Sequence, residues 1–200
     1  MPNILFVDAC PRRGESRTLM LAESLLSELR RHLPDVQITE QRLPDMHLAS
    51  VDAATLAYKE SLCDRHHWDD PLIAPALAFQ QADAVIIAAP YWDMSFPSIL
   101  KVWVENMYVR NLTFCYRNDQ SVGLVKGKVC AYVTTAGSPI GEHDWGTAYI
   151  RDVMHTLGIP GFHTLKAEAL DLASSDPEAI LAAARREVPA LATAIAEALV

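Results

Sequence analysis

The sequence has 200 residues, of which 50% are hydrophobic and 21% charged, and its formal net charge is -8. This length suits one domain with a full hydrophobic core, residues 1–200, and the composition excludes a disordered chain. The Lys and Arg residues are scattered, which argues against a nucleic-acid partner, and no apolar run is long enough to span a membrane. The first residues carry no cationic segment typical of a secretory signal, so we expect a cytoplasmic protein.

The first third of the chain alternates between strand and helix patterns. Residues 3–9 form an apolar run typical of a strand buried on both faces. Residues 18–32 carry leucines at helical spacing, and residues 36–43 alternate as a second strand. The polar stretch 44–75 follows, and we expect one or two helices, around 52–64 and 71–80.

The same alternation continues to the end of the chain. We expect strands at 84–89, 128–134 and 163–170, with helices at 98–108 and 147–157 between them. Asp176, Pro177 and Glu178 are typical of a helix start, and they open an Ala-rich helix that runs to Val200. Pro189 is expected to kink or divide that helix.

Strands that alternate with helices predict an α/β fold with a parallel, doubly wound, five-stranded sheet and helices on both faces. Ligands of such sheets bind beyond the carboxyl ends of the strands, where the strand order reverses. The loops after residues 9, 89 and 134 are therefore the candidate ligand-binding segments.

The first of these loops, residues 10–18, runs from a buried strand into the start of a helix. Free backbone amides and the helix dipole favour an anion there, and Ser16 and Thr18 add hydroxyl groups. Arg12 and Arg17 are candidates for added positive charge. An ordinary helix cap at Ser16 explains the same residues equally well, and the loop has neither a P-loop nor a dinucleotide-binding motif.

The second loop, residues 89–97, holds two prolines that bracket aromatic side chains, a carboxylate and a serine. Each aromatic residue taken singly is typical of core packing. The loop as a whole, placed after the most buried strand, favours a site for a planar ligand. The third loop, residues 135–143, has two glycines that permit close backbone approach, and its His143 is either an active-site group or simply exposed.

Two other features have simple interpretations. The four cysteines include no C-x-x-C pair, so we expect reduced thiols. Residues 63–70 concentrate Cys, His and Asp, but their spacing matches no metal motif, and we predict no metal site.

Taken together, these segments resemble the FMN-dependent NADH-azoreductases and NAD(P)H:quinone oxidoreductases of flavodoxin-like fold. The resemblance rests on the order and spacing of several segments: DACPR at 8–12, ESRT at 15–18, APYWDMSFP at 89–97, LKVWV at 100–104, TF at 113–114, VGLVKGK at 122–128, TTAG at 134–137, LGIP at 157–160 and AEALD at 167–171.

The resemblance implies sheet order 2-1-3-4-5, FMN as cofactor, NADH or NADPH as electron donor, a quinone or azo acceptor, and a homodimer. It implies that Ser16 and Thr18 hold the FMN phosphate. The other cofactor-binding candidates are Cys10, Arg12, Arg17, Pro90, Tyr91, Trp92, Asp93, Met94, Thr135, Ala136, Gly137 and Ser138. His143 and Tyr91 are candidates for proton delivery, and in a dimer the segment 44–75 would reach over the partner's flavin.

The sequence departs from the common family pattern at several of these positions. Cys10 stands where serine is frequent, and Asp93 where asparagine is common. A carboxylate accepts a hydrogen bond from the flavin N3–H but cannot donate one to a carbonyl oxygen. Trp92 is bulkier than the usual residue, and Ala136 and Ser138 replace part of an Arg-Gly-Gly-like turn.

Two other function classes stay open on the sequence alone. One is an electron-transfer flavodoxin without substrate turnover, and the other is a flavin-free binding module on the same fold. Neither NADH nor NADPH is favoured, because no clamp for a 2′-phosphate can be located.

Overall fold

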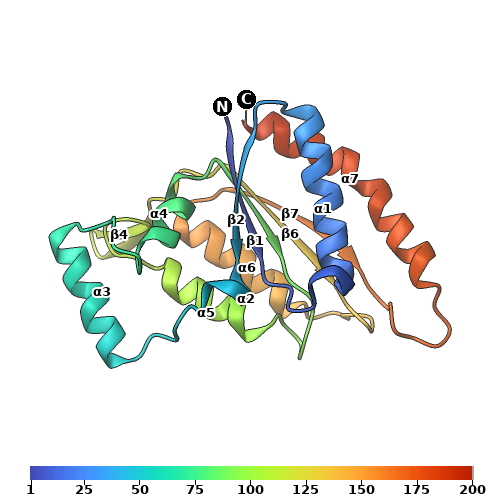
Figure 1. Ribbon diagram of the computed structural model, residues 1–200, viewed down its shortest axis with the longest axis horizontal. Coiled ribbons are helices and arrows are strands. Elements are labelled where there is room, and N and C mark those ends of the chain that lie inside the picture. The colour runs from blue at the N-terminus through green and yellow to red at the C-terminus, as the bar shows by residue number, and fades with distance from the viewer. Residues whose placement is uncertain (200) are drawn as a thin grey trace.

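A five-stranded parallel sheet forms the centre of the computed structural model, which describes residues 1–199 and leaves Val200 outside the described residues. The strand order is β2-β1-β3-β6-β7 (Figure 1), which becomes 2-1-3-4-5 when the sheet's strands are numbered alone, so the predicted topology is confirmed. The bounds are β1 Asn3–Asp8, β2 Gln37–Arg42, β3 Ala84–Ala88, β6 Val129–Thr135 and β7 Gly161–Ala167.

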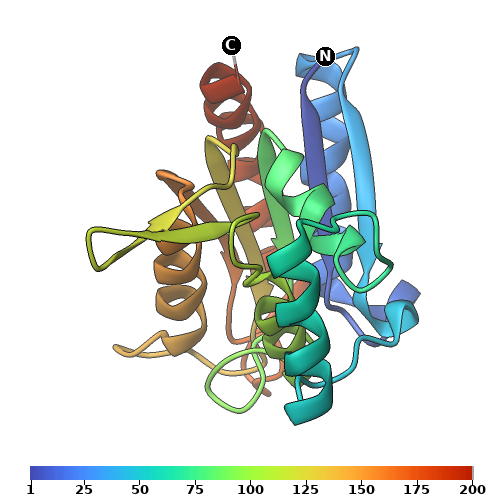
Figure 2. The ribbon, with the colours of Figure 1, turned by 90° about the vertical axis from the view of Figure 1, so that its left-hand side faces the viewer.

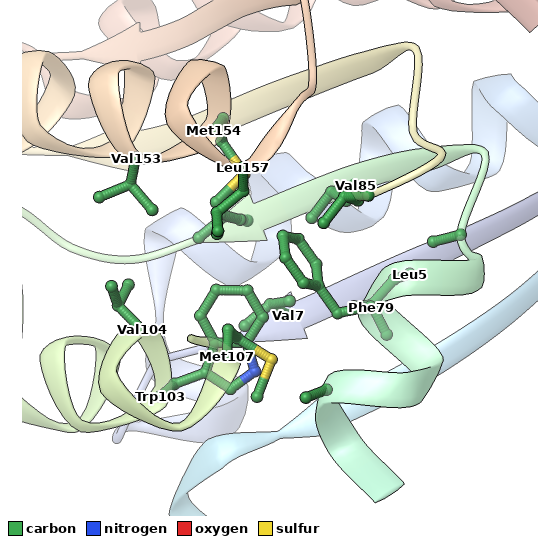
Figure 3. Close-up of a cluster of buried hydrophobic side chains, with 14 of the residues drawn as sticks. Leu5, Val7, Phe79, Val85, Trp103, Val104, Met107, Val153, Met154 and Leu157 are labelled. Carbon is green, nitrogen blue, oxygen red and sulfur yellow. The ribbon is translucent and has the colours of Figure 1, made fainter. Parts of the chain in front are cut away.

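Helices cover both faces of this sheet, and alternate residues of each strand serve opposite faces. Ile4 and Phe6 of β1 pack under α1 and α7, whereas Leu5 and Val7 pack under α4, α5 and α6. Figure 3 shows the second of these cores, where Phe79 and Trp103 meet edge to face with ring centroids 5.4 Å apart. The helices are α1 Arg17–His32, α2 Leu43–Met46, α3 Ala53–Arg65, α4 Ala74–Gln81, α5 Ser98–Met107, α6 Trp145–Leu157 and α7 Pro177–Leu199.

The sequence did not indicate an antiparallel hairpin that lies outside the main sheet. It comprises β4 (Phe114–Arg117) and β5 (Gln120–Gly123), and it projects from the molecule in Figure 2. Its turn residues Asn118 and Asp119 both have positive φ, the conformation of a tight hairpin turn. The strands are short and largely exposed, so they lack the apolar pattern that marks a buried strand.

The last helix runs without a break from Pro177 to Leu199, so Pro189 does not divide it, and of the expected kink or division only the kink stays a prediction. Pro189 is exposed, so water can reach the carbonyl oxygen that its missing N–H leaves free. The Asp176 side chain caps this helix as predicted, accepting from Ala179 N at 3.1 Å. Among residues 1–199, no helix is both long and apolar enough to cross a membrane.

Candidate functional site

A cavity of about 180 Å³ opens at the carboxyl edge of the sheet, where the three candidate loops meet. These loops lie at the lower end of the strands in Figure 1. The cavity sits beside the point where the strand order reverses, between β1 and β3. Its lining comes from all three loops and from Asp171 after β7, so the topology assembles the site from four distant parts of the chain.

The first loop enters α1 through one turn of 3-10 helix, η1 (Arg13–Glu15), and Ser16 is the residue that caps α1. The Ser16 hydroxyl accepts a hydrogen bond from Leu19 N at 3.2 Å. Within residues 1–199, the backbone N–H groups of Arg17 and Thr18 have no protein acceptor. The start of α1 is therefore both a capped helix and a set of free amide donors, with the helix dipole adding positive potential for an anion.

A hydrogen bond between two buried hydroxyl groups fastens the first loop to the third. Thr18 Oγ1 and Thr135 Oγ1 lie 2.6 Å apart, and the two residues are 1% and 7% exposed. Either oxygen can act as donor, and the hydroxyl hydrogen left over stays available to a ligand. The two hydroxyl groups thus place polar atoms between α1 and β6.

The three arginines of the first loop have different surroundings, and Arg13 pairs with Asp45 at 2.6 Å. Arg17 donates to Asp171 Oδ1 at 2.7 Å and to Leu170 O at 3.2 Å, so its charge is already balanced. Arg12 is exposed at the cavity and makes no ion pair with any residue of the described chain. Arg12 is therefore the cation of this loop whose charge is free to meet an anion.

The second loop is held against the third by main-chain contacts. Tyr91 N donates to Thr135 O at 2.9 Å, and Trp92 and Ser95 exchange backbone hydrogen bonds of 2.8 and 3.2 Å across a tight turn. The central residues of that turn, Asp93 and Met94, have φ of 49° and 67°. A left-handed conformation is costly for Met, and such strain is frequent at ligand sites.

An adjoining cavity of about 310 Å³ shares Pro11 and Trp92 with the first one. Asp93, Phe96 and Ile99 also line it, so it offers mostly apolar surface. Trp92 is 39% exposed where the two cavities meet. The first cavity is thus polar and favours an anion, and the adjoining cavity is apolar.

Residues that follow β7 hold the third loop in place. Ala136 N donates to Ala167 O at 2.9 Å, and Asp171 N donates to Gly137 O at 2.9 Å. The Asp171 carboxylate lies so close to Gly137 that a Cβ there would be 2.3 Å from Asp171 Oδ2. A larger residue at position 137 would therefore displace the Asp171 side chain, which fills the space beside the glycine.

Two titratable groups of the site have perturbed pKa values. Burial raises the pKa of the Cys10 thiol to about 12, so Cys10 stays protonated, with its sulfur 3.5 Å from Ala88 O. Burial, and then the negative charges of Asp144 and Glu168, raise the pKa of the Tyr91 phenol. Both groups are therefore neutral at physiological pH.

The structure brings most of the predicted site residues to these cavities. The first is lined by Arg12, Ser16, Arg17, Thr18, Pro90, Tyr91, Trp92, Thr135 and Gly137, and the second adds Asp93. Cys10 and Ala136 are buried and line neither, and Met94 and Ser138 are exposed outside the lining. His143 is exposed and stacks on Trp145, with ring centroids 5.3 Å apart.

Asp171 and Glu15 line the first cavity although sequence reasoning did not select them. The strand that was expected at 163–170 ends earlier, at Ala167, and the chain then bends through Ala169, whose φ is 63°. The rule that ligands bind beyond strand ends, applied to the fifth strand as well, would have found Asp171.

The Cys, His and Asp residues of 63–70 are dispersed. Cys63 faces the core, Asp64 pairs with Arg110 at 2.5 Å, and His67 lies 3.0 Å from Asp69. Within residues 1–199, no three or more His, Cys, Asp or Glu side chains are grouped so that they could hold a metal ion.

Comparisons with known proteins agree on one family. A sequence profile of the flavodoxin-like fold matches residues 2–191. An FMN-dependent NADH:quinone oxidoreductase 2 from Clostridium acetobutylicum is 30% identical over 190 residues, which cover 90% of this chain and 93% of the relative. An FMN-dependent NADH:quinone oxidoreductase from Caldicellulosiruptor saccharolyticus is 27% identical over 201 residues, covering 96% and 98%.

A similar structure is the crystal structure of an FMN-dependent NADH-azoreductase from Bacillus anthracis in complex with FMN. It has a TM-score of 0.86 and 21% identity, and the match covers 98% of this chain and 100% of that one. At this identity the structural likeness shows a shared fold.

Proposed function

This chain belongs to the flavodoxin-like fold family, and we propose that it is an FMN-dependent oxidoreductase that transfers electrons from NADH or NADPH to quinone or azo acceptors. The names of its relatives support this proposal. They describe FMN-dependent NADH:quinone oxidoreductases, and an FMN-dependent NADH-azoreductase shares the fold.

The observation that carries the proposal is the polar pocket at the start of α1, which opens into an apolar cavity. Free amides at Arg17 and Thr18, the Ser16 hydroxyl and the unpaired Arg12 suit a phosphate dianion. Pro11, Trp92 and Phe96 suit a flat aromatic ring nearby. A molecule with a phosphate at one end and a planar ring at the other fits this combination, and FMN has that chemistry.

We assign roles to the site residues on this basis. Ser16, Thr18 and Arg12 hold the phosphate, and Arg17 orders the loop through its ion pair with Asp171. Pro90, Tyr91, Trp92 and Asp93 lie along the ring. Thr135 and Gly137 would meet the ring's other polar edge, whereas Met94, Ala136 and Ser138 line neither cavity and would act only through their neighbours, and Cys10 supports the loop from beneath.

The chemistry supplied by bound FMN is hydride transfer in two half-reactions, first from NAD(P)H and then to the acceptor. The protein's part is to bind, orient and exclude water. Trp92 and Phe96 would pack against the flavin ring and hold it in place. Tyr91, which lines the first cavity and is neutral at physiological pH, is the group placed to deliver a proton, whereas His143 lines neither cavity.

We further propose that residues 1–200 form one FMN-binding domain, that the protein is cytoplasmic, and that it acts as a homodimer. Trp92, Met94 and Trp145 are exposed, and Trp145 lines a further hollow together with Ser95 and Phe96 of the second loop. Exposed apolar surface next to a binding site is typical of a protein interface.

The visible absorption spectrum of the purified protein tests this function directly. The protein is loaded with FMN, freed of excess cofactor, and titrated anaerobically with NADH and then with a quinone. We expect flavin absorption that bleaches with NADH and returns with the quinone, and steady-state kinetics with parallel double-reciprocal lines. A protein that takes up no FMN would be a binding module, and one that binds FMN without NADH bleaching would be an electron-transfer flavodoxin.

A matched pair of variants links the spectrum to the site. Ser16→Ala removes a hydroxyl from the pocket, and we expect FMN affinity to fall about fivefold or more. Ser24→Ala removes a hydroxyl from the same helix, where Ser24 bonds only to Met20 O at 2.9 Å. We expect Ser24→Ala to bind FMN as the wild type does.

A further inference from the structure

Lys59 is a buried lysine that the proposed flavin chemistry does not use. It lies on α3, is 6% exposed, and reaches across to the C-terminal end of α5. There Nζ donates to Glu105 O at 2.9 Å and to Asn106 O at 3.2 Å. These carbonyls belong to the last turn of α5, where helix carbonyl groups lack partners within the helix.

Lys59 has no carboxylate partner within 4.0 Å among the described residues. The Glu105 carboxylate is paired with Lys101, and Asp64 is paired with Arg110. Two acceptors satisfy both N–H bonds of a neutral amine, whereas an ammonium group would bury a third N–H without a partner. The contacts therefore leave one position on the nitrogen without a partner, and in the neutral amine that position is the lone pair that can react.

Burial opposes the protonated form of this side chain more strongly than the nearby Cys63 and Glu105 favour it. A helix C-terminus attracts a cation, but loss of water lowers the pKa of Lys59 to about 8. The charged or titratable groups around it are Glu60 and Cys63 on α3, Glu105 on α5, and Tyr108, Arg110 and Tyr116 across the cavity. Near pH 7.5, roughly a quarter of such an amine is neutral, against roughly one part in a thousand for an ordinary lysine.

A cavity of about 230 Å³ lies beside Lys59, between α3 and the segment that leads into the β4–β5 hairpin. Figure 1 shows α3 and β4 side by side at the end of the molecule away from α7. Aromatic rings form one side of the cavity: Phe114 lies 5.6 Å from both Tyr108 and Tyr116, centroid to centroid. No lining residue is shared with the two cavities of the candidate flavin site.

We propose that Lys59 is a carbonyl-reactive site that binds an aromatic aldehyde in this cavity as an imine. The Lys59 nitrogen lone pair attacks the aldehyde carbon, and the carbonyl π electrons move to oxygen, which takes a proton. The nitrogen loses its protons, the C–O bond breaks, and one water molecule leaves as the C=N bond forms. No electrons are gained or lost overall, so the step needs no oxidant or reductant.

The neighbouring thiol does not compete for the aldehyde. Burial raises the pKa of Cys63, so the thiolate that would attack is scarce. The aromatic side chains favour a flat ring over an alkyl chain, because stacking and edge contacts add to simple burial. The aromatic cavity therefore accounts for the preference for a flat ring, and the amine accounts for the reaction with a carbonyl group.

Trapping with benzaldehyde and sodium cyanoborohydride tests the proposal on the full-length protein, with and without FMN. The reductant converts the imine to a stable benzyl amine, and peptide mass spectrometry measures the labelling rate at each lysine. At pH 7.5 we expect Lys59 to be labelled at least about tenfold faster than Lys126, an exposed lysine that serves as an internal control. We expect this preference to shrink with propanal, which has no ring, and to be the same whether or not FMN is bound.

Two variants sharpen the result. Lys59→Arg should remove the fast-labelled site and leave Lys126 unchanged, and Tyr116→Ala should reduce the preference for benzaldehyde over propanal. The proposal is overturned if Lys59 in the wild type reacts no faster than Lys126, or if both aldehydes show the same preference. These rates do not depend on NADH oxidation, so failure here is distinct from failure of the proposed flavin function.

Discussion

The hydroxyl oxygens of Thr18 and Thr135 lie 2.6 Å apart although the residues are 117 positions apart in the sequence. One stands in the first turn of α1 and the other at the end of β6. Their hydrogen bond spans the edge of the sheet where the strand order reverses, and it fixes two of the three loops that surround the candidate flavin site.

Removing one member of this pair should leave the other hydroxyl buried without a partner. Valine has nearly the shape of threonine and suits a strand, so the main effect of Thr135→Val is the loss of the hydrogen bond. We expect this variant to lower the free energy of unfolding by about 1–2 kcal/mol and to bind FMN more weakly. Denaturant unfolding and fluorescence titration with FMN measure the two effects. Thr164→Val, on the exposed side of β7, is the control, and equal behaviour of the two variants would contradict the assigned role.

Asp171 restrains the positive charge of Arg17 beside the proposed phosphate site, through a contact of 2.7 Å. Asp171→Asn should remove the ion pair through which Arg17 orders the loop, and so weaken FMN binding about two- to fivefold. Arg12→Ala should weaken binding by about tenfold, because the unpaired charge is lost. Titrations at two salt concentrations check both losses, and tighter binding by Asp171→Asn would show that Arg17 serves the phosphate through its free charge and not through its ion pair.

Gly137 lies directly against the Asp171 side chain. Gly137→Ala would place Cβ 2.3 Å from Asp171 Oδ2, so the Asp171 side chain must move and its pairing with Arg17 must change. We expect weaker FMN binding, partly recovered when Asp171→Ala is added. Gly14→Ala is the matched control, because nothing lies within 4 Å of its added methyl group.

The turn at Trp92–Ser95 stores backbone strain at Met94, where φ is 67°. Asparagine tolerates this conformation better, so Met94→Asn should stabilise the protein by about 0.5–1 kcal/mol. Met20→Asn, at an exposed methionine inside α1, should instead destabilise it. Thermal unfolding of both variants measures the difference, and a loss of stability at position 94 would mean that the methionine side chain contributes more than the strain costs.

Lys59 should make the free energy of unfolding depend on pH. Its folded-state pKa of about 8 lies below the unfolded value of 10.5, so the unfolded chain binds more protons between these values. The free energy of unfolding of the wild type, relative to that of Lys59→Met, should therefore rise from pH 8 to 10.5 by about 3 kcal/mol at most. Denaturant unfolding across this range measures it, with the exposed Lys126→Met as the control, and a flat difference for Lys59 would disprove the shift.

Much of the fold could be read from local pattern. The apolar runs at 3–9, 84–89 and 128–134 are strands because both of their faces are covered, and the leucine spacing after Thr18 marks α1. The hairpin β4–β5 escaped detection because its exposed strands have no apolar signature. The unbroken course of α7 through Pro189 was not predicted either, because whether water reaches the carbonyl that proline leaves free depends on the tertiary structure.

The sequence by itself determined the α/β class, the family resemblance and the three loops, because periodicity and strand order follow from residues close together in the chain. Only the tertiary structure decided which residues of those loops face the cavity. It joined Thr18 to Thr135, paired Arg17 with Asp171 and left Arg12 unpaired, and it buried Lys59 against the end of α5. These facts depend on burial and on contacts between distant segments, which no local pattern specifies.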